Sequence, residues 1–186
     1  MRKINLLEDK KLKKKKALLN SAYELFTSRG FHRTTIDAIA FKAGVSKGSF
    51  YNYFQDKEDI RDALIVAKSG EIFDDSLAAL TNNGDNLPPV EKLIFIIDYI
   101  LDTLSRDISL LRFISKNLSW ALLTSEKTYA KNENSESMTF REFIERMLEG
   151  DGIELTKELE LSIFTIIELV NSTCHTVILE GLPVTF

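Results

Sequence analysis

Residues 34–54 read TTIDAIAFKAGVSKGSFYNYF, a sequence with two short helical patterns on either side of a brief turn. The first pattern places apolar residues at the i, i+3, i+4 and i+7 positions of an amphipathic helix, namely Ile36, Ile39, Ala40 and Ala43. We expect Thr34 to be the N-cap of this helix, with Asp37 three residues later in a capping box. Gly44 then ends the helix.

The second pattern begins directly after the turn. Ser46 is a good N-cap residue, so a shorter helix is predicted from Lys47 to about Phe54, with Phe50 and Phe54 pointing inward from one face. Only residues 44–46 separate the two helices, which is the length of the turn in a helix-turn-helix motif. In that motif the second helix enters the major groove of DNA and presents its first residues to the base edges.

The segments around this motif also follow helical patterns. A helix is predicted from Ala17 to Arg29, ended by Gly30, and Asp56 is placed to cap a fourth helix. Before Ala17, residues 10–16 contain six lysines in seven positions, a block that repels itself and should be frayed or disordered at its start. The block is either a solvated face or a sequence-independent contact with DNA phosphates.

The charge distribution divides the chain in two. Residues 1–57 carry 13 Lys and Arg against 5 Asp and Glu, whereas residues 58–186 carry 11 against 23. A basic first part suits a polyanionic partner, whereas an acidic second part is repelled by one. We therefore expect two domains with different tasks, residues 1–57 and residues 58–186.

The whole chain is predicted to be all-α, with about nine helices. Eight glycines and three prolines among 186 residues are too few turn residues for a many-stranded sandwich or barrel. Beyond the fourth helix, apolar spacing and helix breakers predict further helices over residues 89–106, 110–123, 138–149 and 155–180, the second of them with a bend or a break.

The stretch from Ala17 to Leu64 resembles the DNA-binding domain of the TetR family of bacterial repressors, above all in TTIDAIA (34–40), AGVSKGSFYNYF (43–54) and KE (57–58). The resemblance implies that two side chains hold DNA phosphates and that the start of the second helix of the motif, the recognition helix, contacts bases. It also implies that an aromatic pair reaches the DNA backbone and groove. The phosphate ligands are Thr35 and Lys57, the base contacts are Lys47, Gly48 and Ser49, and the aromatic pair is Tyr51 and Tyr53.

The same resemblance implies a general plan for the molecule. A helix-turn-helix DNA-binding domain with a basic N-terminal arm (1–57) is joined to a helical effector-binding and dimerisation domain (58–186). The expected function is that of a ligand-responsive transcriptional regulator, a homodimeric repressor that a small molecule releases from a palindromic operator in double-stranded DNA. The alternative is a constitutive DNA-binding protein, or an activator, without a small-molecule effector.

The last predicted helix is apolar around nearly its whole circumference, as expected of a helix that is buried on every side. It either forms the centre of a monomer's core or packs one face against a second copy, and the resemblance implies the second arrangement. Together with the segment before it, this helix supplies the predicted dimer interface: Phe143, Met147, Ile163, Ile167, Val170, Cys174 and Ile178.

Two groups of side chains are candidates for contact with a small apolar or aromatic effector. The aromatic candidates either line a cavity between helices or belong to the core: Phe95, Tyr99, Phe113, Trp120 and Phe164. The polar candidates share a face of the last helix and need a partner, either a ligand or a hydrogen bond across an interface: Glu168, Asn171 and His175.

No enzyme activity, cofactor or metal site is expected. The sequence lacks the G-x-S-x-G, Walker and H-E-x-x-H motifs, and its two histidines, His32 and His175, are far apart. A single cysteine, Cys174, excludes an internal disulfide and a multi-cysteine metal site. No run reaches the roughly 18 apolar residues that span a bilayer, so we expect a cytoplasmic protein without a membrane partner.

Overall fold

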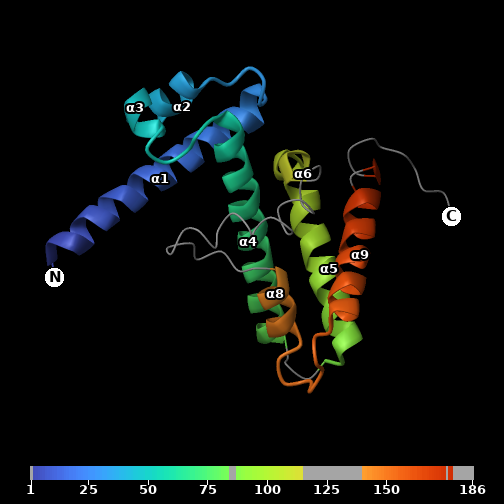
Figure 1. Cartoon of the computed structure of the whole chain (residues 1–186). Helices are drawn as coiled ribbons and strands as arrows, with labels where there is room; N and C mark the ends of the chain where they lie inside the picture. The colour runs from blue at the N-terminus through green and yellow to red at the C-terminus, as the bar shows by residue number, and fades with distance from the viewer. Residues whose placement is uncertain (1, 84–86, 115–139, 175, 178–186) are drawn as a thin grey trace. The chain divides into compact units, whose positions relative to one another are not determined.

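The computed structural model describes residues 2–83, 87–114, 140–174 and 176–177 (Figure 1). These residues form eight α-helices and no strand, which confirms the all-α prediction. The chain divides into two compact units, residues 1–64 and residues 65–186, and the division falls inside one long helix, α4 (Lys57–Asn83).

The first unit contains α1 (Arg2–Arg29), α2 (Ile36–Lys42), α3 (Lys47–Phe50) and the start of α4. Its buried side chains come from all four helices and from the end of the turn after α3: Leu18, Ala22, Leu25, Phe26, Ile39, Ala40, Phe50, Phe54, Ile60 and Leu64. The inward orientation predicted for Phe50 and Phe54 is confirmed, and their ring centroids lie 5.7 Å apart. This core fixes the short helices α2 and α3 against the longer α1 and α4.

The helix ends of this unit are set mostly by the residues that the sequence indicates. Gly30 and Gly44 have φ angles of 85° and 68°, the left-handed conformation that glycine adopts without strain. The hydroxyl of Ser46 accepts a hydrogen bond from the Ser49 amide at 3.1 Å. The carboxylate of Asp56 accepts one from the Asp59 amide at 2.7 Å. These stops and caps confirm the predicted ones.

The cap predicted for α2 is wrong by one residue. Thr35, not Thr34, is the N-cap, and its Oγ1 accepts a hydrogen bond from the Ala38 amide at 3.2 Å. Thr34 is buried, and its hydroxyl donates to the carbonyl oxygens of Gly30 (2.9 Å) and Leu25 (3.3 Å). Thr34 therefore ties the loop before α2 to the end of α1.

Two helix lengths also differ from the predictions. The lysine block, residues 10–16, is helical as part of α1 and is not frayed there, because lysine is a good helix former and its exposed ammonium groups are screened by solvent. Helix α3 ends at Phe50 instead of about residue 54. Beyond it the chain continues as a turn in which the amides of Tyr53 and Phe54 both donate to the carbonyl of Phe50.

The second unit contains the rest of α4, followed by α5 (Pro89–Arg106), α6 (Ile108–Ile114), α8 (Phe140–Met147) and α9 (Lys157–Cys174). Pro89 occupies the first turn of α5, as predicted. Figure 1 shows α5 and α9 side by side, and the two helices are in contact. The core between the helices includes Phe73 and Phe143, whose ring centroids are 4.6 Å apart.

Candidate nucleic-acid interface

The residues expected to face DNA surround the start of α3. Thr35, Lys47 and Gly48 are exposed, and Ser49 is half-buried. Tyr51 is 51% exposed, and its ring packs edge-on against the buried Phe50 at 5.5 Å. Tyr53 and Lys57 are half-buried. The structure thus leaves four of the seven exposed and three half-buried around the turn, α3 and the start of α4.

The first turn of α3 is held by short-range hydrogen bonds that leave its outer surface open. Ser46 Oγ lies 3.0 Å from Ser49 Oγ, in addition to the bond that it accepts from the Ser49 amide. A Cβ atom on Gly48 would meet Ser46 Oγ at 4.0 Å, which is an ordinary contact. No described atom of the chain therefore requires glycine at position 48.

Lys47 is held across the turn by an ion pair. Its Nζ donates to Oδ2 of Asp37, the second residue of α2, at 2.9 Å, and both side chains are more than half exposed. This hydrogen bond and the charge of the Asp37 carboxylate raise the pKa of Lys47 above its ordinary value. The ammonium of Lys47 therefore stays charged at neutral pH, and its direction is set by Asp37.

Lys57, expected to contact a phosphate, is engaged inside the unit. Its Nζ donates to the carbonyl oxygens of Phe31 (3.0 Å) and Thr34 (3.2 Å) and lies 4.3 Å from the centroid of the Phe31 ring. The guanidinium of Arg61 lies over the same ring at 5.1 Å. One N–H of the ammonium remains for a phosphate. Sequence reasoning missed this anchoring role, because nothing in the spacing links position 57 with position 31.

A family model described as bacterial regulatory proteins of the TetR family matches residues 18–64, the segment that builds this motif. Residues 18–64 thus match the TetR family, and the match covers α2, α3 and parts of α1 and α4. Three curated relatives each match part of this chain. YdgC of Bacillus subtilis, an HTH-type transcriptional regulator, is 32% identical over 102 residues, which is 54% of this chain and 52% of YdgC.

The TetC protein of transposon Tn10 from Escherichia coli is 31% identical over 103 residues, 45% of this chain and 52% of TetC. RutR of Escherichia coli K12 is 39% identical over 80 residues, 43% of this chain and 36% of RutR. The chain thus spans about half the length of the first two relatives and about a third of RutR. YdgC and RutR are both named as transcriptional regulators, in agreement with the prediction that this chain is not an enzyme.

Solved structures extend the likeness of fold to both units. A TetR transcriptional regulator from Rhodococcus sp. RHA1 has a TM-score of 0.64 at 18% identity, covering 94% of this chain and 89% of that one. The lauroyl-CoA complex of FadR from Thermus thermophilus has a TM-score of 0.54 at 22% identity, covering 92% and 96%. The stearoyl-CoA complex of FadR from Bacillus subtilis has a TM-score of 0.53 at 20% identity, covering 89% of this chain and 87% of that one.

The predicted effector contacts lie in the second unit and are only partly described. Phe95, Phe113 and Phe164 are half-buried and pack against the main core, and Tyr99 is also half-buried. Glu168 has one buried carboxylate oxygen, Oε1, without a hydrogen-bond partner among the described residues. The predictions at Trp120 and His175, and at the side chain of Asn171, lie outside the described residues. Effector contact stays a prediction.

The residues predicted for the dimer interface differ in burial within a single subunit, and their contact with a second copy stays a prediction. Phe143, Met147, Ile163 and Ile167 are each at most 4% exposed within a single subunit, because they form its own core. Val170 is half-buried. The remaining two predictions, at the side chain of Cys174 and at Ile178, lie outside the described residues.

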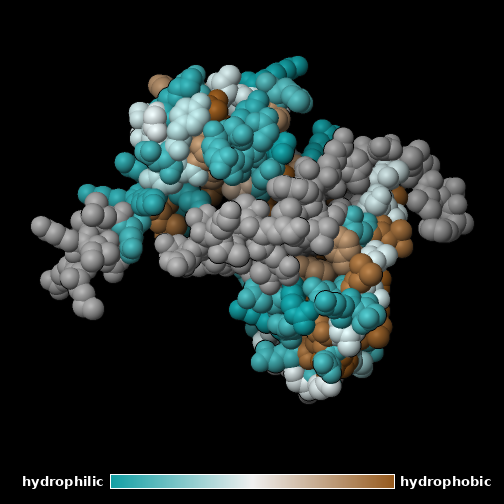
Figure 2. Space-filling model, in the orientation of Figure 1, coloured by the Kyte–Doolittle hydropathy of each residue, from teal (hydrophilic) through white to brown (hydrophobic). Residues whose placement is uncertain are grey.

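The accessible apolar side chains of α9 are three others that the sequence analysis did not select. Leu161, Ile166 and Leu169 are 63%, 41% and 68% exposed. Helical geometry places Leu161 and Leu169 on the side of α9 opposite the buried Ile163 and Ile167, and Ile166 between the two sides. Figure 2 shows apolar surface along this helix.

No described helix is long and apolar enough to cross a membrane. Within the same part of the chain, no group of three or more His, Cys, Asp or Glu side chains is placed to hold a metal ion.

Proposed function

We propose that this chain is a DNA-binding transcriptional regulator that acts as a homodimeric repressor and leaves its operator when a small molecule binds. The observation that carries the proposal is the accessible start of α3, where Lys47 and Gly48 are exposed and Ser49 is half-buried in a helix-turn-helix. A donor-bearing lysine, a glycine that allows close approach and a serine hydroxyl form a surface suited to base edges in the major groove. Thr35, Tyr51 and Lys57 supply donors for the flanking phosphates.

A dimer supplies the geometry that a palindromic operator requires. Two recognition helices about 34–36 Å apart reach successive major grooves on one side of the duplex. The exposed stripe Leu161, Ile166 and Leu169 on α9 supports such a dimer, because large apolar side chains at 41–68% exposure favour burial against a second copy. We assign the self-interface to this stripe and to Val170.

A small apolar or aromatic effector is proposed for the second unit. The FadR structures from Thermus thermophilus and Bacillus subtilis, which share this fold, hold lauroyl-CoA and stearoyl-CoA. The Oε1 atom of Glu168, which has no hydrogen-bond partner among the described residues, favours a ligand with a hydrogen-bond donor near α9. The effector releases DNA only to the extent that it binds one conformer more tightly than the other.

Selection of bound sequences from random DNA tests the proposal. The unmodified chain should enrich a near-palindromic sequence whose half-sites lie one helical turn apart. Lys47→Ala should weaken binding to that sequence by about ten-fold or more, the loss expected for a direct base contact. Lys157→Ala removes the same charge from an exposed position at the start of α9 and should leave binding unchanged.

Failure to enrich any sequence would refute the regulator proposal. If a sequence is enriched but Lys47→Ala and Lys157→Ala lose equal affinity for it, Lys47 does not contact the bases. A thermal-shift screen of small molecules, followed by measurement of operator release, separates the repressor from a constitutive DNA-binding protein, because a protein without an effector shows no specific stabilisation.

A further inference from the structure

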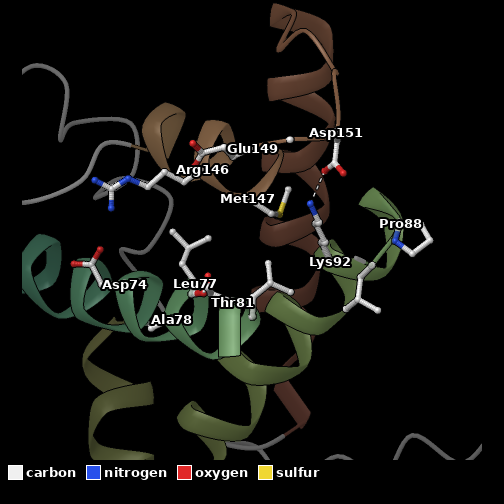
Figure 3. A pocket seen from close by; sticks show the side chains of 13 residues that line it. Asp74, Leu77, Ala78, Thr81, Pro88, Lys92, Arg146, Met147, Glu149 and Asp151 are labelled. Carbon is white, nitrogen blue, oxygen red and sulfur yellow. Dashed lines mark hydrogen bonds and ion pairs between the residues drawn. The ribbon is translucent and has the colours of Figure 1, made fainter. Parts of the chain in front are cut away.

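The second unit contains a cavity of about 1070 Å³ between α4, α5 and α8 with the turn that follows α8 (Figure 3). None of the described effector candidates lines it, so it is separate from the aromatic group around Phe95 and Phe164. Its walls include Leu77, Leu80, Leu87 and Met147. The volume is at the upper end of the range of small-molecule sites.

One end of this cavity holds a buried cation. Lys92 in the first turn of α5 is 4% exposed, and its Nζ pairs with Oδ2 of Asp151 at 2.7 Å. An ammonium group has three N–H donors, and among the described residues Asp151 supplies the one acceptor. In the part of the chain that the structure describes, two donors of this buried cation have no acceptor, and a partner inside the cavity can supply one. Buried donors without acceptors cost free energy, so a bound acceptor is favoured here.

The local backbone fixes the position of Asp151. It stands between Gly150 and Gly152, whose φ angles of 86° and 66° form a tight turn after α8. The Asp151 amide donates to the carbonyl of Leu148 at 3.1 Å. Figure 3 shows Lys92 reaching from α5 toward Asp151, beside Met147. The ion pair therefore closes one end of the cavity at a defined place.

The other charged side chains of the cavity are exposed. Asp74 on α4 and Arg146 and Glu149 near the end of α8 lie at its solvent side (Figure 3). Charges in water attract a ligand weakly compared with a buried one, because solvent screens them. The buried group with spare hydrogen-bonding capacity is the cation, and the wall beside it is apolar.

We propose that this cavity binds a small organic acid, whose anionic head accepts hydrogen bonds from Lys92 and whose apolar body lies against Leu77, Leu80 and Met147. The shared position of a buried donor and an apolar wall selects an amphipathic anion over an alcohol or an amine. The proposal concerns binding alone and does not depend on release of DNA, which the second measurement below examines separately.

Isothermal titration calorimetry with hexanoate, 1-hexanol and hexylamine tests the head group while the apolar body stays constant. Hexanoate should bind about ten- to 100-fold more tightly than the alcohol, the range expected for hydrogen bonds to a charged group. Equal affinities would overturn the proposal. A preference for hexylamine would overturn it as well, because the acidic side chains would then determine the ligand.

Two substitutions at the ion pair should act in opposite directions. Lys92→Met should abolish the preference for hexanoate, whereas Lys157→Met, which removes the same charge from an exposed position, should retain it. Asp151→Asn removes the internal counter-ion and leaves the ammonium in place, so hexanoate should bind several-fold more tightly than to the unmodified chain. A merely structural ion pair predicts no gain in Asp151→Asn.

Asp151→Asn also keeps the proposal testable if Lys92→Met does not fold. Weaker or unchanged binding of hexanoate to a folded Asp151→Asn protein would overturn the assignment of Lys92. The effect of hexanoate on operator affinity is then measured in the same samples. Binding without any change in operator affinity supports the cavity assignment and argues against this cavity as the effector site of the proposed repressor.

Discussion

The two units of this chain are specified by the sequence in different ways. In residues 1–64, glycines and caps set the helix ends through contacts a few residues apart, as at Gly44 and Ser46. In residues 65–186 the decisive contacts join distant positions, such as Phe73 with Phe143 and Lys92 with Asp151. A recognition surface built by local rules is visible in the sequence, whereas a buried face or a cavity depends on packing that the sequence does not display.

The largest expected effect compares two faces of α9 in the second unit. Ile167→Glu places a carboxylate at a position that is 4% exposed, so it should cost more than about 4 kcal/mol of unfolding free energy and leave the unit unfolded. Leu169→Glu, at 68% exposure, should change the stability of the subunit by no more than about 0.5 kcal/mol. Circular dichroism and urea denaturation measure both.

Sedimentation of the same two variants examines the proposed self-interface. Folded Leu169→Glu protein should sediment as a monomer at micromolar concentration while the unmodified chain sediments as a dimer. A folded, dimeric Leu169→Glu protein would contradict the assignment of Leu161, Ile166 and Leu169 to the interface. A folded, monomeric Ile167→Glu protein would instead support the interface predicted from the sequence, which includes Ile167.

The next effect compares two phenylalanines of the first unit. Phe50 is fully buried beside α3, and Phe50→Ala should cost about 3–5 kcal/mol, the usual range for loss of a buried aromatic side chain. Phe41, on α2, is 88% exposed, and Phe41→Ala should change the unfolding free energy by less than about 0.5 kcal/mol. A similar loss in both variants would show that Phe41 is covered in solution.

A smaller effect is expected when glycine is replaced by alanine once in each unit, and the two changes in unfolding free energy should have opposite signs. Gly44→Ala forces alanine to a φ of 68° and should destabilise by about 1 kcal/mol, although its Cβ meets no described atom within 4 Å. Gly70 lies within α4 and also has open space, so Gly70→Ala should stabilise by about 0.5–1 kcal/mol through helix propensity. Urea denaturation of the pair gives the signs directly.

The helices of the first unit were predictable from its sequence, but the end of α3, the order of the lysine block and the choice between two residues that compete for one role were not. Thr34 and Thr35 both have the side chain of an N-cap, and the choice between them depends on which is buried against the end of α1. That burial is a tertiary fact, because Thr34 reaches the carbonyl of Leu25, nine positions away. The anchoring of Lys57 on Phe31 was hidden for the same reason.

In the second unit the sequence predicted helices but not their faces. Residues of α9 are apolar on both sides, so periodicity alone does not distinguish Ile167, in the core, from Leu169, at the surface. The pairing of Lys92 with Asp151 joins α5 to the turn after α8, and no spacing rule links positions so far apart. The cavity beside them was therefore invisible to a motif search.

The smallest expected effect concerns Lys47, whose ammonium is shared between Asp37 and the predicted DNA surface. Asp37→Asn breaks the 2.9 Å ion pair and frees Lys47 for the groove, so operator binding should strengthen by about two- to three-fold at low salt. The melting temperature should hardly change, because both side chains are more than half exposed and such pairs contribute little to stability.

Glu24→Gln is the matched control for this variant. It breaks the other ion pair of similar exposure in the first unit, between Glu24 and Lys42 at 2.7 Å, and removes the same negative charge. A gain with Asp37→Asn alone assigns the effect to Lys47, because the long-range electrostatic change is equal in the two variants. An equal gain in both would mean that net charge, and not the position of Lys47, controls affinity. A loss with Asp37→Asn would show instead that Asp37 holds Lys47 in the geometry that DNA requires.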